Sequence, residues 1–300
     1  MSGPHDPTHD PVFRIMHATD LSPDSASAFV HALKLAWATG AELDVLHVSP
    51  QPGAAALAHL PGVGDTLRRW GLHVLRGEAG SARASTLRVG KIVAIDRDPV
   101  HAAIEYVHGH PTDLVVLGTV QRHGVERWLH KATAEPLARR SGTMTLFVPS
   151  RSTGFVAEAS GAVSLRRVLL PVNRTPAPQA AVDATQALLT GLGCAGSIAR
   201  TLHVGTPVSA SPVDRSESAT CTWESAVAAG SPVDEIVVAA SAWPADLVVV
   251  TTEGHAGILD ALRGSTTERI LRRLACPLLA VPVGSRAMPR LFSGAAPWRA

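Results

Sequence analysis

The stretch from Asp246 to Pro282 shows most clearly which class of fold the sequence predicts. It opens with an apolar, β-branched run, Asp246-Leu-Val-Val-Val-Thr251, and closes with Cys276-Pro-Leu-Leu-Ala-Val-Pro282. Continuous apolar runs of this kind predict strands that are covered on both faces of a sheet. Between them, apolar residues at helical spacing are surrounded by arginines. The stretch therefore predicts a strand, a glycine-containing loop, a helix and a second strand.

A Gly264-Ser265 turn stands where this helix begins. The free backbone N–H groups and the positive dipole end of a helix start favour an anion. The alternative is purely structural, because serine is also a common cap of a helix. Both interpretations stay open from the residues alone.

The same pattern occurs twice in the chain. The first predicted strand between Asp246 and Pro282 has a counterpart in Asp113-Leu-Val-Val-Leu117. An earlier predicted strand in each repeat is followed by a polar residue, Asp20 in the first and Asn173 in the second. We therefore predict two α/β domains and three connecting or terminal segments. These are an arm (1–11), domain 1 (12–149), a linker (150–165), domain 2 (166–283) and a tail (284–300).

The two repeats differ in length. His47 and His203 are 156 positions apart, whereas Pro99 and Pro232 are only 133 apart, so the second repeat is 23 residues shorter in its middle. The corresponding segment of domain 2 is rich in serine and proline. This predicts that domain 2 has lost or shortened one helix.

Alternation of apolar strands and helices predicts a parallel sheet with helices on both faces. Ligands of such sheets bind beyond the carboxyl ends of the strands, where the strand order reverses. Asp20 or Asn173, together with the loop after the fourth strand of each domain, would lie there.

The repeated architecture and its motif resemble the universal stress protein family. Nucleotide-binding members of that family carry Gly-x2-Gly-x9-Gly-(Ser/Thr) after the fourth strand, and this chain has Thr251-x2-Gly254-x9-Gly264-Ser265. The resemblance implies a tandem member in which each domain is a five-stranded parallel sheet. It also implies that the domains pair through their last strands, as a monomer that mimics a family dimer or as a homodimer.

The resemblance further implies an adenine nucleotide, ATP or ADP with Mg²⁺, in domain 2. Thr251 departs from the family's first glycine and adds a Cβ where ribose would approach, and Asn173 replaces an aspartate but still offers hydrogen bonds. The implied binding residues are Asn173, Thr251, Gly254, Gly264, Ser265 and Thr266.

Domain 1 keeps only one glycine of this pattern, Gly118. Gln121 adds a side chain where backbone would approach phosphate, and Lys131-Ala132 replaces the Gly-Ser turn. Glycine tolerates a close approach and a positive φ because it has no Cβ. We therefore predict a degenerate nucleotide motif in domain 1.

Composition excludes several other classes of protein. The net charge of +2 argues against a nucleic-acid binder, and no apolar run approaches a membrane span. The three cysteines form no C-x-x-C pair, which suits reduced thiols. We therefore expect a cytoplasmic protein with no nucleic acid and no membrane partner.

No motif predicts a metal site or turnover. No histidine pair has zinc-enzyme spacing, and neither a G-x-S-x-G elbow nor a P-loop is present. His47 and His203 occupy the same strand position in both repeats, which indicates a packing or strand-end role. Arg269, Arg272 and Arg273 are expected to form a solvated helix face.

Three functional hypotheses remain. The first is a stress-linked regulatory module that binds a nucleotide through domain 2 and is not an enzyme. The second is a nucleotide-independent interaction protein whose sites have decayed, with a protein partner that the sequence does not identify. The third, an enzyme related to adenylyl-transfer folds, is disfavoured because no base, metal or lysine signature accompanies the loop.

Overall fold

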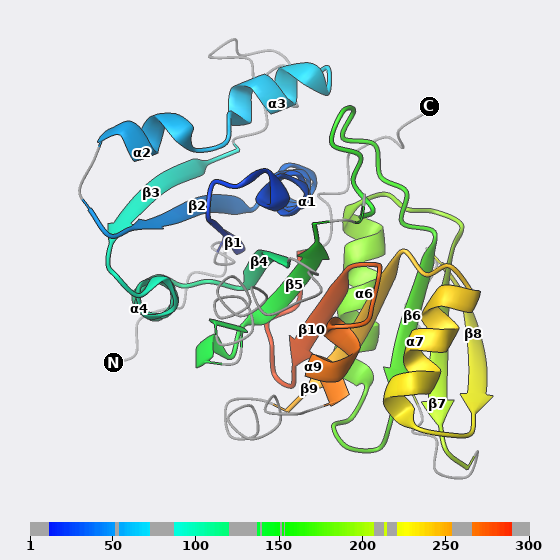
Figure 1. Cartoon of the computed structure of the whole chain (residues 1–300). Helices are drawn as coiled ribbons and strands as arrows, with labels where there is room; N and C mark the ends of the chain where they lie inside the picture. The colour runs from blue at the N-terminus through cyan, green and yellow to red at the C-terminus, as the bar shows by residue number, and fades with distance from the viewer. Residues whose placement is uncertain are drawn as a thin grey trace, which may run out of the picture.

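The computed structural model places one ten-stranded sheet at the centre of the molecule (Figure 1), with strand order β3-β2-β1-β4-β5-β10-β9-β6-β7-β8. The predicted arm, 1–11, and the tail from 290 lie outside the described residues. The structure describes residues 12–51, 54–72, 87–119, 137–138, 140–150, 152, 154–206, 213–214, 221–253 and 266–289.

Domain 1 supplies one half of the sheet, and its neighbouring strands are all parallel. Its elements alternate as the sequence predicts, with two short helices in the long middle segment. They are β1 (Arg14–Thr19), the 3₁₀ helix η1 (Pro23–Ser25), α1 (Ala26–Thr39), β2 (Glu42–Ser49), α2 (Ala54–His59), α3 (Val63–Arg69), β3 (Val89–Ile95), α4 (Pro99–Gly109), β4 (Leu114–Thr119) and β5 (Met144–Pro149).

Domain 2 repeats the arrangement, again with parallel neighbours. The structure also locates its third strand, β8, which the repeat analysis did not place. The elements are β6 (Arg167–Val172), α6 (Gln179–Gly191), β7 (Ser197–Val204), β8 (Cys221–Ala228), α7 (Pro232–Ala242), β9 (Leu247–Thr252), α9 (Thr266–Leu271) and β10 (Leu278–Pro282).

The middle of domain 2 is short. Within the described residues between β7 and β8, which are 205–206 and 213–214, there is no helix. This agrees with the predicted loss or shortening, and the rest of that segment lies outside the described residues.

Helices cover both faces of the sheet. Residues of α1, α3 and α6 share one buried cluster with alternate strand residues, and residues of α4, α7 and α9 share a second cluster on the opposite face. The central strands β4 and β9 are buried on both sides, and each begins with four consecutive buried residues. This burial explains their continuous apolar sequences, because each large aliphatic side chain gains about 1.5–3 kcal/mol on removal from water.

The two domains join through their last strands. β5 pairs with β10 antiparallel, with Phe147 opposite Leu278 and Thr145 opposite Ala280, and this is the one antiparallel pairing among the described strands of the sheet. The predicted pairing through the last strands is therefore confirmed within the chain.

The linker between the domains packs against domain 1. Phe155 and Val156 are fully buried or nearly so, and an isolated bridge joins Val156 to Val163. The N–H groups of Phe155 and Val156 both donate to Nε2 of His31 on α1, at 3.0 and 3.2 Å. The linker thus contributes to the core of domain 1.

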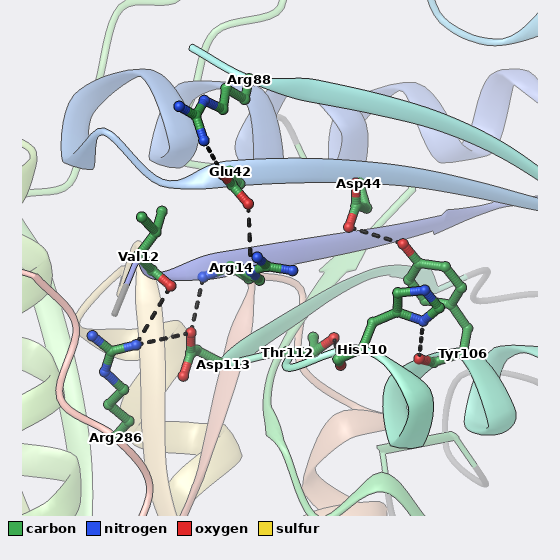
Figure 2. A network of polar contacts seen from close by, with 10 residues as sticks. All are labelled: Val12, Arg14, Glu42, Asp44, Arg88, Tyr106, His110, Thr112, Asp113 and Arg286. Carbon is green, nitrogen blue, oxygen red and sulfur yellow. Dashed lines mark hydrogen bonds and ion pairs between the residues drawn. The ribbon is translucent and has the colours of Figure 1, made fainter. Parts of the chain in front are cut away.

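The start of the tail returns to the amino edge of domain 1 (Figure 2). Arg286 lies 3.5 Å from the Asp113 carboxylate, and that carboxylate also accepts the N–H of Arg14 at 2.9 Å. Arg286 also donates to the carbonyl of Val12 at 3.5 Å. The segment after β10 therefore contacts the residues that come just before β1 and β4.

Candidate functional site

The predicted site residues of domain 2 gather at the carboxyl edge of its strands. Asn173 directly follows β6, and Thr251 and Thr252 end β9. These two strands are parallel neighbours, with Val168 opposite Leu247, so their carboxyl ends lie at the same edge. The structure therefore brings together the first and fourth strand ends on which the sequence prediction relied.

Thr251 is turned toward helix α6. Its Oγ1 accepts the backbone N–H of Ala181 at 3.2 Å, in the first turn of α6. The same N–H also donates to the carbonyl of Pro178 at 3.0 Å, so the hydroxyl is a second acceptor for this donor in the first turn of the helix. The side chain that replaces the family's first glycine thus links the end of β9 to the start of α6.

Asn173 is exposed, and its Oδ1 accepts the N–H of the next residue, Arg174, at 2.8 Å. In domain 1 the Asp20 carboxylate accepts both the N–H and the hydroxyl of Ser22, at 2.9 and 2.6 Å. Both side chains therefore shape the turn after the first strand of their domain. The side-chain NH2 group of Asn173 takes no part in the hydrogen bond that shapes this turn.

Helix α9 begins at Thr266 beside the end of β9. Thr252, Thr267 and Glu268 line one small cavity of about 20 Å³, enough for about one water molecule. Gly254, Gly264 and Ser265 lie outside the described residues. The described residues on either side of this loop nevertheless show that it leaves and re-enters the fold at the same edge.

Domain 1 contributes to this region, which the sequence did not indicate. Thr143, Thr145 and Phe147, on or just before β5, line the same cavity as Thr252 and Glu268. Their position follows from the antiparallel β5–β10 pairing, which crosses the boundary between the domains. No local sequence signal encodes such a contact.

Helix α9 is fixed by ion pairs. Glu268 is buried and pairs with Arg272 one turn later, and Arg273 pairs with Asp234 on α7. The hydrogen bond from Arg273 lowers the pKa of the Asp234 carboxyl below its ordinary value. The predicted solvated face is thus exposed, but two of its arginines also hold α9 in place.

Domain 1 differs at the equivalent edge. A Cβ added at Gly118 would lie 3.4 Å from Cα of Ser25 and 3.5 Å from the carbonyl oxygen of Asp24. The start of α1 therefore packs against the end of β4, at a distance that is ordinary van der Waals contact for a Cβ. Gln121, Lys131 and Ala132 lie outside the described residues.

The paired histidines have the strand-end role that their repeat position predicts. Nδ1 of His47 lies 3.0 Å from the carbonyl of Thr19, and Nδ1 of His203 lies 3.3 Å from the carbonyl of Val172. Each joins the second strand of its domain to the last residue of the first strand. This prediction is confirmed.

Other kinds of site are absent from the part of the chain that the structure describes. Among those residues, no group of three histidine, cysteine or acidic side chains is placed to hold a metal ion. None of the described helices has both the length and the apolar character that crossing a membrane requires. Cys194, Cys221 and Cys276 are free thiols, and burial raises the pKa of Cys194 and Cys276 to about 11.

Comparisons with known proteins agree with this geometry. The model of the universal stress protein family matches residues 12–149 and 213–282. No protein with curated annotation matches the sequence significantly.

Three solved structures resemble the fold over nearly the whole chain. A universal stress protein from Archaeoglobus fulgidus DSM 4304 is 15% identical, with a TM-score of 0.58 over 90% of this chain and 98% of that one. A functionally unknown protein from Pseudomonas aeruginosa PAO1 is 14% identical, with a TM-score of 0.55 over 90% and 92%. The cytoplasmic domain of a prokaryotic cation chloride cotransporter is 10% identical, with a TM-score of 0.54 over 92% and 98%. At these identities the likeness shows the fold.

Proposed function

Because the chain belongs to the universal stress protein family, we propose that it is a regulatory protein that binds ATP or ADP, with Mg²⁺, through domain 2. One observation carries the proposal. Thr252 and Thr267, on either side of the Gly254–Ser265 loop, line one cavity at the carboxyl edge of the sheet. This is the edge at which open α/β sheets bind ligands.

The proposed roles follow from position. Backbone N–H groups at Gly264 and Ser265, with the hydroxyls of Ser265 and Thr266, would receive the phosphates at the start of α9. Asn173 would offer its amide group to the adenine end from the adjacent strand. Gly254 would allow the chain to approach the nucleotide without a Cβ.

The proposed role is regulation and not turnover. Binding at a loop of backbone donors stabilises a bound state of the protein without requiring a general base. A nucleotide would then act by binding to the Gly254–Ser265 loop, which connects β9 to α9. Sustained hydrolysis of ATP at a catalytic rate would contradict this part of the proposal.

A second candidate is a nucleotide-independent interaction protein. The observation that favours it is the hydrogen bond between Thr251 and Ala181, because it fills the position of the family's first glycine with a side chain. The degenerate motif of domain 1 is consistent with the same loss.

Calorimetric titration of nucleotide-stripped protein with ATP and Mg²⁺ distinguishes the two candidates. We expect one site per chain and no binding by the variant Gly264→Lys, which copies the lysine that domain 1 carries at its equivalent position. Ala132→Lys adds the same side chain to the loop of domain 1 and should bind as the parent protein does. Absence of heat and of a thermal shift at millimolar ATP would leave only the second candidate.

A further inference from the structure

Domain 1 contains a cavity of about 200 Å³ that the proposed nucleotide site does not use. It lies between η1, α1 and α3, and the linker closes one side. Its lining includes Thr19, Phe29, Thr66 and Glu158, but no residue of β4 or of the loop that follows it. The cavity adjoins the turn after β1, and none of its lining residues belongs to domain 2, in which we propose the nucleotide site.

The backbone at the mouth of this cavity is strained. Leu21 has a φ of 63° and is the one non-glycine residue with positive φ within the described part of the chain. A branched side chain in this conformation costs on the order of 1–2 kcal/mol. A hydrogen bond from the N–H of Leu21 to Oγ1 of Thr19, at 3.0 Å, stabilises this backbone conformation.

Two opposite charges border the cavity without pairing with each other. Arg69, at the end of α3, makes no side-chain hydrogen bond or ion pair within the described residues, whereas its neighbour Arg68 pairs with Asp65. The carboxylate of Glu158, on the linker, likewise has no cation bound to it in the part that the structure describes. Both side chains are exposed at the cavity's mouth.

The positions of these two charges are coupled. Nε1 of Trp70, the residue after Arg69, donates to the backbone carbonyl of Glu158 at 3.0 Å. The same indole packs over Gly161, where an added Cβ would overlap its ring. Trp70 therefore fixes the linker against the end of α3 and keeps both charges at one opening.

We infer that this cavity binds a small zwitterion of the α-amino-acid type. Arg69 binds its carboxylate and Glu158 binds its ammonium group, because charge-assisted hydrogen bonds are the strongest polar contacts available at such an opening. The side chain of the ligand enters the cavity toward Phe29 and Val30.

The size of the cavity sets the size of this side chain. The space of about 200 Å³ is open to solvent on one side and is large enough for a small aliphatic side chain, since a closed cavity of about 150 Å³ already accepts benzene. The hydroxyls of Thr19 and Ser25 are bonded to each other at 2.9 Å, and Ser25 also donates to the carbonyl of Ser22. His59 and Thr66 also line the cavity, so its wall is mixed, and Phe29 and Val30 form the apolar part that faces the ligand's side chain.

The site belongs to domain 1 alone. Its outer wall is α3 and the loop before it, which lie in the segment that is 23 residues longer than its counterpart in domain 2. We therefore expect one site per chain. The inference does not rest on nucleotide binding, and the variant Gly264→Lys should keep it.

The test is an NMR or calorimetric titration of the full chain with three probes of matched shape. L-Valine carries both charges, 3-methylbutanoate lacks the ammonium group, and 2-methylpropylamine lacks the carboxylate. We expect saturable binding of L-valine, and at least about tenfold weaker binding of each single-charge analogue. Equal binding of 3-methylbutanoate and L-valine would overturn the zwitterion assignment in favour of a simple anion site.

Substitutions locate the binding. Arg69→Gln and Glu158→Gln should each weaken L-valine binding about tenfold, while the adjacent Arg68→Gln should leave it unchanged. Both Arg69 and Glu158 are exposed, so the variants should fold, and their thermal transitions check this. No saturable binding of L-valine at millimolar concentration, or binding that neither substitution weakens, would overturn the inference.

Discussion

Domain 1 buries two imidazoles at positions where domain 2 buries only aliphatic groups. When Asp20 is matched with Asn173, His17 on β1 corresponds to Leu170 on β6, and His31 on α1 corresponds to Ala184 on α6. All four side chains are buried. Both domains therefore bury the side chains at these positions, but only the histidines of domain 1 can bind a proton.

His17 illustrates the cost of this difference. Its Nδ1 donates to the carbonyl of Val116 at 3.0 Å, while its Nε2 is buried and has no partner within the described residues. Burial lowers the pKa of this imidazole from 6.5 to about 4. A charged His17 would lack solvent on one side, so the domain folds with the neutral ring.

His31 holds the linker through the neutral form of its imidazole. Its Nδ1 donates to the carbonyl of Ser27 at 2.6 Å, which leaves Nε2 as the acceptor of the two linker N–H groups. Burial lowers the pKa of His31 to about 4 as well. Protonation of Nε2 would remove the acceptor that holds the linker, whereas domain 2 has no equivalent dependence at Ala184.

The largest expected effect is therefore acid destabilisation of domain 1. Both histidines have a folded-state pKa below the unfolded value, so the unfolded chain binds more protons between pH 6.5 and pH 4. The folding free energy that depends on keeping both imidazoles neutral is fully present above pH 6.5 and is lost as the pH falls toward 4. Each contributes up to about 3 kcal/mol over this range. Urea unfolding in a pH series measures the loss.

The variant His17→Leu copies domain 2 and isolates one of these protons. It should reduce the slope of the free energy of unfolding between pH 4 and 6.5 by about one proton, or about 1.4 kcal/mol per pH unit. Titrating carboxylates contribute equally to both proteins and cancel in the comparison. An unchanged slope would show that His17 does not titrate as burial requires.

A smaller effect is expected from the contact between His31 and the linker. Gly154 has a φ of 60°, and a Cβ there would overlap the His31 ring. Gly154→Ala should therefore displace the imidazole from Phe155 and Val156 and cost about 3 kcal/mol of unfolding free energy. Chemical denaturation at neutral pH measures this cost.

Gly193 in domain 2 provides the matched control. Its φ of 66° is nearly the same, but nothing lies within 4 Å of an added Cβ. Gly193→Ala should cost only the conformational penalty, about 1 kcal/mol. If the two substitutions cost the same, the linker contact adds nothing to the stability of domain 1.

Local patterns in the sequence predicted most of the fold. The apolar runs after Asp113 and Asp246 located the central strands, and the shared turn residues Asp20 and Asn173 aligned the two domains. These features succeed because burial on both faces of a parallel strand requires continuous apolar residues. The missing segment between His203 and Pro232 was also visible as a difference in spacing.

Contacts between distant segments could not be predicted in this way. The linker is rich in serine, glycine and alanine, yet Phe155 is fully buried and its ring packs edge-on against His31, 124 residues earlier, which also accepts its N–H. Strand β8 lies at the sheet edge and has only half-buried and exposed residues, so it lacks the continuous apolar signal of β9. The cavity beside Arg69 depends on the folded linker in the same way.

The sequence predicted where the candidate nucleotide site lies in the fold, but it did not predict how its side chains are oriented. The strand ends at Asn173 and Thr251 lie together as parallel topology requires. The hydrogen bond from Ala181 to Thr251 was not foreseen, because the sequence does not show which way a threonine rotamer turns. Whether the edge binds a nucleotide stays a prediction for the titration with Gly264→Lys.

The smallest expected effect concerns the comparison of Thr251 with Gly118. Thr251→Val keeps the shape of the side chain but removes the hydroxyl, so the N–H of Ala181 keeps only the carbonyl of Pro178 as its acceptor. It should cost about 1 kcal/mol, while Thr251→Ser, which keeps the hydroxyl, should cost less. Equal costs would show that the hydroxyl does not stabilise the start of α6.

Thr251→Gly completes this comparison, since it restores the residue that domain 1 retains at Gly118. It should cost more stability than Thr251→Val, because both lose the same hydrogen bond and glycine in a strand also loses more conformational freedom on folding. If a nucleotide approaches this strand end, removal of the Cβ should also strengthen ATP binding severalfold, because backbone alone then faces the ribose. Unchanged affinity in a variant that still binds ATP would place the ribose away from Thr251 and confine the site to the Gly264–Ser265 turn.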